Sequence, residues 1–291
     1  MATIGVYDSG IGGLTTLKHL IQRFTGNDFY YLADNANLPF GSKSTEELTT
    51  VVNAGIAKLR KHADMIVLAC NTASSLTQDG DVYKLLPPVC GACADPQCKA
   101  YRAQNARSIQ CKTTAAQNAK SIQRETLVDQ NLDSAQHDTS RTQNAEYDSA
   151  TLLLATPKTI DNLSGKFSCK SAQTKDLATL IEIQASLRHA RGDLDMSELM
   201  PYLYEKLSPF KGVKNVALGC SHYLYCKPQI RQILGDVTFC DGNNALIREL
   251  SKTVSSNSRA ISKIEFAFTS TDESRKYENI MKLLVNTNVD I

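Results

Sequence analysis

Short strands with no polar face, next to helical segments, constrain the fold of this chain more than any other feature. Residues 3–7 (TIGVY) and 65–69 (MIVLA) are two such strands. Residues 44–62 have the pattern of a helix, and Ser44 and Glu47 at its start have the spacing of a capping box. Strands without polar alternation are covered on both faces, as in parallel sheets flanked by helices. The sequence therefore predicts an α/β fold.

The alternation of strands and helices returns after a polar interruption. Further strands and a last helix are expected at residues 151–156, 213–218, 237–240, 264–268 and 272–284. Since the pattern occurs on both sides of the interruption, we predict two doubly wound, mostly parallel α/β domains related by an approximate two-fold axis. The active site is expected in the cleft between them, where the strands end.

The chain is expected to cross between the two domains and return. We assign residues 1–96 and 246–291 to the first domain, because the alternation suggests a return of the chain after Asp241. Residues 97–245 then form the second domain. This division makes the first domain discontinuous in sequence.

A polar tract lies near the join of the two predicted domains. Between Gln97 and Asp148 only five of 52 residues are aliphatic beyond alanine, and residues 98–110 are repeated at 111–123 with nine of 13 positions identical. So few apolar side chains cannot form a separate core. We therefore expect a peripheral surface insertion at about residues 97–141, with a composition that permits one or two helices.

Charge and hydropathy exclude several classes of partner. The chain has 32 Lys and Arg against 30 Asp and Glu, a formal charge of +2, which gives no footprint for nucleic acid or an anionic membrane. No apolar run approaches the ~18 residues of a membrane span. The first residues also lack the charge and apolar pattern of a signal peptide. We expect a cytoplasmic protein with neither a nucleic-acid nor a membrane partner.

The cysteines form an odd set of nine, which in a reducing compartment favours free, catalytic or metal-bound thiols over disulfides. Cys90 and Cys93, with Cys98 nearby, have the spacing of half a zinc site. Zinc usually takes four ligands, and the sequence offers no second pair of this kind. We therefore expect no metal, and the roles of Cys90, Cys93, Cys98 and Cys111 stay open.

Two cysteines occupy equivalent places at the ends of predicted strands. Cys70 and Cys220 lie 150 residues apart, and each is followed by residues that can form hydrogen bonds, Asn71 and Thr72 in one case and Ser221 and His222 in the other. A lone cysteine at a strand end is usually a small buried apolar residue. Two of them in matching surroundings favour a pair of thiols that face one cleft.

Four stretches of the sequence carry a resemblance to a known family. DSGIGGLT (8–15), YLADNANLPFGSKS (31–44), ACNTAS (69–74) and LGCSHY (218–223) resemble the signature stretches of glutamate racemase, in the order of that family. The resemblance covers nearly everything except about residues 97–141. It implies a cofactor-independent isomerase that interconverts L- and D-glutamate, with no pyridoxal phosphate, nucleotide or metal, and that supplies D-glutamate for peptidoglycan.

The resemblance also implies roles for individual residues. Cys70 and Cys220 match the two proton shuttles, a thiolate and a thiol that exchange roles with the direction of the reaction. Asp8 matches a carboxylate on the Cys70 side, and His222 and Glu182 match acid–base groups on the Cys220 side. The positions that match substrate-binding residues of the family are Asp8, Ser9, Phe40, Gly41, Ser42, Asn71, Thr72, Ser221 and His222.

Some positions depart from the family pattern, and two alternatives remain. Ser221 and Phe40 replace Thr and Tyr, and residues 224–226 (LYC) replace a Pro-Leu pattern, which could alter the packing of that loop. The alternatives are a racemase of a related acidic amino acid such as aspartate, and a non-catalytic relative that binds an amino acid or a protein. We expect a homodimer in each case.

Overall fold

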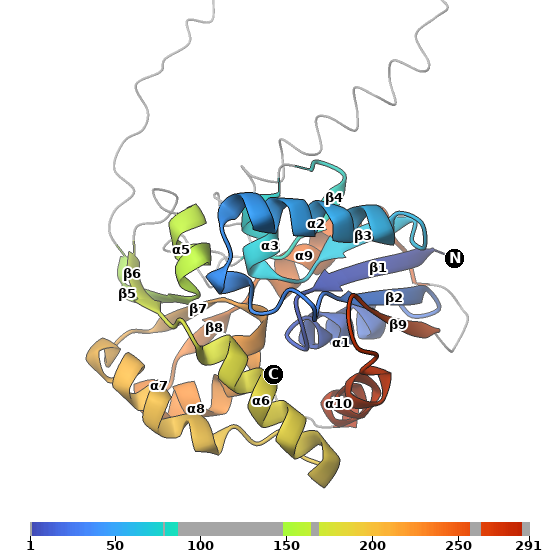
Figure 1. Ribbon diagram of the computed structural model, residues 1–291. Helices are drawn as coiled ribbons and strands as arrows, with labels where there is room; N and C mark the ends of the chain where they lie inside the picture. The colour runs from blue at the N-terminus through green and yellow to red at the C-terminus, as the bar shows by residue number, and fades with distance from the viewer. Residues whose placement is uncertain (1, 78, 87–147, 164–168, 257–262, 287–291) are drawn as a thin grey trace, which may run out of the picture.

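The protein forms two parallel sheets with helices packed against them (Figure 1). This computed structural model describes residues 2–77, 79–86, 148–163, 169–256 and 263–286. Every strand pair in these ranges is parallel. The predicted α/β class with two mostly parallel sheets is confirmed. The predicted insertion, together with Cys90, Cys93, Cys98 and Cys111, lies outside the described residues.

The first sheet has five strands in the order β4-β3-β1-β2-β9. Their bounds are β1 Thr3–Asp8, β2 Asp28–Ala33, β3 Met65–Leu68, β4 Val82–Lys84 and β9 Ile264–Phe268. Its helices are α1 Leu14–Arg23, α2 Thr45–Leu59, α3 Asn71–Leu76, α9 Asn243–Leu250 and α10 Ser274–Asn286. The last strand and two of the helices come from the end of the chain, so this sheet combines both ends of the sequence.

The second sheet has four strands in the order β6-β5-β7-β8. Their bounds are β5 Asp148–Ala155, β6 Cys169–Gln173, β7 Asn215–Gly219 and β8 Thr238–Cys240. The helices are α5 Pro157–Leu163, α6 Leu177–Arg188, α7 Met200–Leu207 and α8 Lys227–Leu234. Short 3-10 turns at Phe40–Ser42, His189–Arg191, Ser197–Leu199, Ser208–Phe210 and Ser221–Cys226 complete the regular structure.

Strands β1 and β5 are buried on both faces, as their sequences predict. Ile4 and Val6 of β1 are fully buried in a cluster with α1, whereas Tyr7 is buried on the other face against α2. On β5, Leu152 and Leu153 likewise point into different clusters. Each such side chain contributes roughly 1.5–3 kcal/mol through removal from water. The first of these clusters includes residues of both sheets, so the two halves share a continuous core.

Helix α2 begins as its sequence predicts. The Ser44 hydroxyl accepts a hydrogen bond from the Glu47 backbone N–H at 3.1 Å, and the Glu47 carboxylate accepts one from the Ser44 N–H at 2.8 Å. This capping box satisfies two backbone donors that the first helical turn leaves free. None of the helices in the described ranges combines the length and apolar character needed to cross a membrane.

Candidate active site

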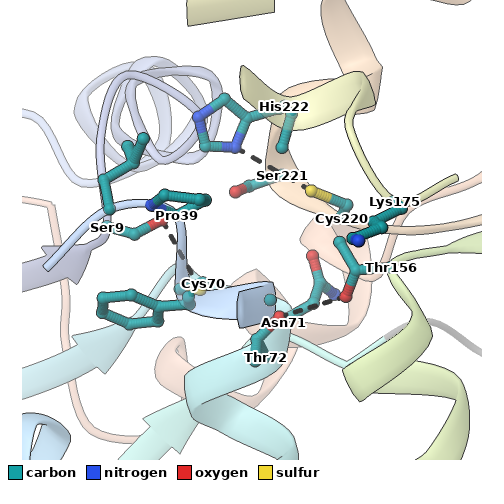
Figure 2. A pocket seen from close by; sticks show the side chains of 14 residues that line it. Ser9, Pro39, Cys70, Asn71, Thr72, Thr156, Lys175, Cys220, Ser221 and His222 are labelled. Atoms are coloured by element: carbon teal, nitrogen blue, oxygen red, sulfur yellow. Dashed lines mark hydrogen bonds between the residues drawn. The ribbon is translucent and has the colours of Figure 1, made fainter. Parts of the chain in front are cut away.

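A cavity of about 460 Å³, including its open mouth, lies where strands of both sheets end (Figure 2). Its lining residues are Ser9, Leu38, Pro39, Phe40, Gly41, Cys70, Asn71, Thr72, Thr156, Lys175, Ala178, Cys220, Ser221 and His222. The carboxyl ends of parallel strands are where α/β proteins bind ligands. The cavity is therefore the candidate active site.

The two cysteines singled out in the sequence line this one cavity from opposite sides (Figure 2). Cys70 follows β3 of the first sheet and Cys220 follows β7 of the second. Their exposed fractions are 6% and 7%. Tertiary structure thus brings together two thiols that lie far apart in the chain.

Cys70 lies beside a hydroxyl group and near a carboxylate. Its thiol donates a weak hydrogen bond to the Ser9 hydroxyl oxygen at 4.0 Å. Burial raises the pKa of the Cys70 thiol above its ordinary value, and the nearby Asp8 carboxylate raises that pKa further. Both effects favour the protonated thiol at Cys70.

Cys220 begins a chain of acid–base groups. Its sulfur lies 3.8 Å from His222 Nδ1, and the other ring nitrogen of His222 lies 2.9 Å from Glu182 Oε1. Burial acts to lower the pKa of His222, but the contacts with Cys220 and Glu182 outweigh it and raise that pKa well above the ordinary value. Burial acts to raise the pKa of Glu182, yet the hydrogen bond and charge of His222 lower it overall. An imidazolium held by a carboxylate therefore contacts the sulfur.

Asp8 lies behind the cavity wall and joins the two sheets. Its Oδ2 accepts a hydrogen bond from the Ser221 hydroxyl at 3.0 Å, and its Oδ1 accepts one from the Gly10 backbone N–H at 2.9 Å. The side chain is fully buried. Burial raises the pKa of Asp8 although His222 and these hydrogen bonds act to lower it.

The glycine-rich loop after β1 permits the close approach of the second sheet. A Cβ atom at Gly12 would overlap the Ser221 hydroxyl and lie 2.6 Å from His222 Nδ1. The next residue back along the chain, Ile11, donates its backbone N–H to Glu182 Oε1 at 2.6 Å, and its carbonyl accepts from the Tyr225 hydroxyl at 3.0 Å. Glycine is needed here because any side chain would displace the acid–base groups.

The residues predicted from the family motifs divide into two groups. Those that line the cavity are Ser9, Phe40, Gly41, Cys70, Asn71, Thr72, Cys220, Ser221 and His222. Asp8, Glu182 and Ser42 do not line it. The first two contact lining residues, whereas the exposed Ser42 donates its hydroxyl to the Pro39 carbonyl at 3.0 Å.

Five lining residues were not predicted from the sequence. They are Leu38, Pro39, Thr156, Lys175 and Ala178. Thr156 directly follows β5, and Lys175 lies two residues after β6. The rule that ligands bind at strand ends could have found both, had β6 been recognised as a strand.

The departure from the family pattern after His222 is accommodated by packing. Leu224, Tyr225 and Cys226 are 1%, 4% and 0% exposed. The Tyr225 hydroxyl ties this turn to the Ile11 carbonyl of the glycine-rich loop. The altered residues therefore stabilise the contact between the two sheets beside Cys220.

Comparison with known proteins gives a consistent picture, although no family model matches the chain. Glutamate racemase of Halothermothrix orenii is 26% identical over 96% of this chain and 98% of its own length. The crystal structure of Campylobacter jejuni glutamate racemase matches with a TM-score of 0.64 at 19% identity, over 98% of this chain and 99% of that one. Francisella tularensis glutamate racemase in complex with D-glutamate matches with a TM-score of 0.61 at 20% identity, over 98% and 94%. The resemblance that the four motifs indicate is thus confirmed, and it extends over almost the whole chain: the protein is similar in sequence to the glutamate racemases, which are isomerases, and shares their fold.

Proposed function

We propose that the protein interconverts L-glutamate and D-glutamate by a two-base transfer of the α-proton, without a cofactor. The observation that carries this proposal is the pair of buried cysteines, Cys70 and Cys220, that line one cavity from different sheets. Inversion at carbon requires a base on one face and an acid on the other. A cysteine, with an ordinary pKa of about 8.5, can serve as either near neutral pH.

The contacts of the two sulfurs suit opposite roles in the proton transfer. The His222 ring lies 3.8 Å from the Cys220 sulfur and, when protonated, can stabilise a negative charge that forms there, whereas burial raises the pKa of the Cys70 thiol and favours its protonated form. In one direction the Cys220 thiolate takes the α-proton: the Cα–H bond breaks, an S–H bond forms, and the electron pair stays on the substrate. The Cys70 thiol then gives its proton to the opposite face of the carbanion. The reverse reaction exchanges the two roles.

The remaining lining groups suit a substrate with two carboxylates. Ser9, Thr72 and Ser221 provide hydroxyls, and Asn71 provides an amide. Such donors can hold a carboxylate and stabilise the charge that develops next to it during proton removal. The Francisella tularensis relative, whose structure contains D-glutamate, supports an acidic amino acid as the substrate class.

Circular dichroism of L-glutamate incubated with the protein tests the proposal. The ellipticity should decay to zero as the racemic mixture forms, and EDTA should not slow the decay. L-Aspartate, assayed in parallel, tests the related racemase as an alternative. Ellipticity that persists with every substrate would remove the racemase proposal and leave a non-catalytic binding protein.

Several wider expectations accompany this proposal. We propose a division into domains of residues 1–96 plus 246–291 and residues 97–245, supported by the return of β9 to the first sheet. A homodimer is supported by Ile183 and Leu187 on α6, which are 53% and 58% exposed on one helical face. A cytoplasmic location and the supply of D-glutamate for peptidoglycan follow from the proposed activity.

A further inference from the structure

Lys175 is a lining residue of the cavity that the motifs do not include. It lies in the short connection between β6 and α6 and is exposed. Figure 2 shows its side chain beside Thr156 and Cys220, with the nitrogen directed toward the open space. Among the described residues that line the cavity, it is the one lysine or arginine.

Lys175 differs from other partly enclosed lysines of the described ranges in having no carboxylate partner there. Lys276 lies 2.9 Å from Glu273 and 3.8 Å from Glu182, and Lys227 lies 3.2 Å from Asp241. Within the described ranges, by contrast, the ammonium group of Lys175 forms neither an ion pair nor a hydrogen bond. An unpaired cation at the wall of a cavity is available to an anionic ligand.

A cation in this site would strengthen the binding of a dicarboxylate beyond what the neutral donors provide. Glu182 and Asp8 place carboxyl groups directly behind the wall, and the other lining donors, Ser9, Asn71, Thr72 and Ser221, are neutral. The lining therefore offers little positive charge apart from His222, whose ring nitrogens contact Cys220 and Glu182. Among these lining groups, Lys175 is the remaining cation that can neutralise a substrate carboxylate.

The depth of the groups indicates which carboxylate this is. Both thiols are buried, so the reacting carbon and the carboxylate attached to it lie at the inner end of the cavity. The side-chain carboxylate of glutamate is two methylene groups farther from that carbon. Lys175 is exposed. This exposure is what a group at the mouth of the cavity would have.

We infer that Lys175 binds the side-chain carboxylate of the substrate and selects acidic amino acids over their amides. This inference rests on the proposed racemase function and extends it with a residue that determines specificity. Lysine acts here as a point charge on a flexible stem, so arginine can replace it in part, whereas a neutral side chain of similar length cannot.

Steady-state kinetics of Lys175→Met, Lys175→Arg and a control test the inference. Lys175→Met should raise KM for glutamate roughly 30-fold, about 2 kcal/mol, with kcat within three-fold of the wild type. Lys175→Arg should restore most of the affinity. Lys61→Met, at an exposed lysine outside the cavity, is the matched control and should leave both constants unchanged. An unchanged KM in Lys175→Met overturns the inference.

Calorimetric binding of glutamate and glutamine separates the inference from the proposed function. Wild-type protein should prefer glutamate, and Lys175→Met should lose that preference through weaker glutamate binding alone. An equal loss of affinity for glutamate and glutamine would mean that Lys175 does not bind the side-chain carboxylate, and it would overturn the inference. Binding of glutamate without racemisation would overturn the proposed function while leaving the role of Lys175 to be judged by these affinities. Absence of glutamate binding would overturn both.

Discussion

The hydroxyl of Ser221 donates a hydrogen bond to Asp8 Oδ2 at 3.0 Å, across 213 residues of sequence. The bond joins the end of β1 in the first sheet to the turn after β7 in the second. A second bond between the sheets, from the Ile11 N–H to Glu182, lies beside it. The two proposed halves of the active site are therefore held together by buried polar contacts as well as by apolar packing.

Removal of either thiol should stop racemisation. Cys70→Ala and Cys220→Ala should each reduce the rate by roughly 10²–10⁴-fold or more, because a site with one acid–base group cannot remove and return a proton on opposite faces. Each variant should still eliminate a leaving group from one enantiomer of a β-substituted analogue. Proton exchange in deuterated buffer provides the measurement, and wild-type racemisation by either variant would contradict the two-base assignment.

Ser221→Ala should destabilise the protein and impair the site. The substitution leaves a buried carboxylate oxygen of Asp8 without its side-chain donor, which costs about 1–3 kcal/mol. Thermal unfolding should record a lower Tm. Ser221→Thr keeps the hydroxyl and serves as the control, with stability and activity close to those of the wild type. Equal stability of the alanine and threonine variants would show that this hydrogen bond contributes little.

Glu182→Gln should move the alkaline limb of the pH profile to lower pH. Glu182 and Cys220 raise the pKa of His222, and the charge of Glu182 is lost in the variant while the Gln carbonyl can still accept from the Ile11 N–H. If protonated His222 supports the Cys220 thiolate, activity falls as pH rises through the pKa of His222, and this fall should begin earlier in the variant. The profile of kcat against pH measures the shift. An alkaline limb at the same pH in the variant and the wild type would show that titration of His222 does not cause the loss of activity at high pH.

Gly12→Ala should impair catalysis more than folding. The added methyl group would overlap the Ser221 hydroxyl and lie 2.6 Å from His222 Nδ1, so these groups must move. We expect a loss of roughly 100-fold in kcat, since small displacements of reacting groups are costly. Gly80→Ala is the matched control, because its Cβ would meet nothing within 4 Å. Comparable activity in both variants would contradict the steric argument.

Deletion of one repeat copy, residues 111–123, should leave kcat within a few-fold of the wild type. The tract has few apolar residues, and its motifs do not match those that carry the chemistry. Circular dichroism of the folded variant and a racemisation assay provide the test. A loss beyond ~100-fold, about 2.7 kcal/mol of barrier, with the fold intact, would assign the tract a role at the active site.

The sequence alone determined the elements whose signals are local. Strand β1 and the start of helix α2 follow from the apolar run before the first loop and from the Ser44–Glu47 capping box. The motifs also predicted Cys70 and Cys220 at strand ends, because the sequence shows both the residue type and the apolar run that precedes it. Such features depend on neighbours a few residues away.

Tertiary structure decided the features that depend on distant residues. Strand β6 lies at the edge of its sheet and has a largely polar sequence with only two buried residues, so it gave no clear apolar run. Lys175 beside it was therefore not predicted as a cavity residue. The hydrogen bond from Ser221 to Asp8 and the need for glycine at position 12 also depend on tertiary structure, because each involves residues far apart in the chain. Periodicity fixes which face of an element is apolar, but the packing of two sheets against each other decides which polar groups meet, and that packing is set by the whole core.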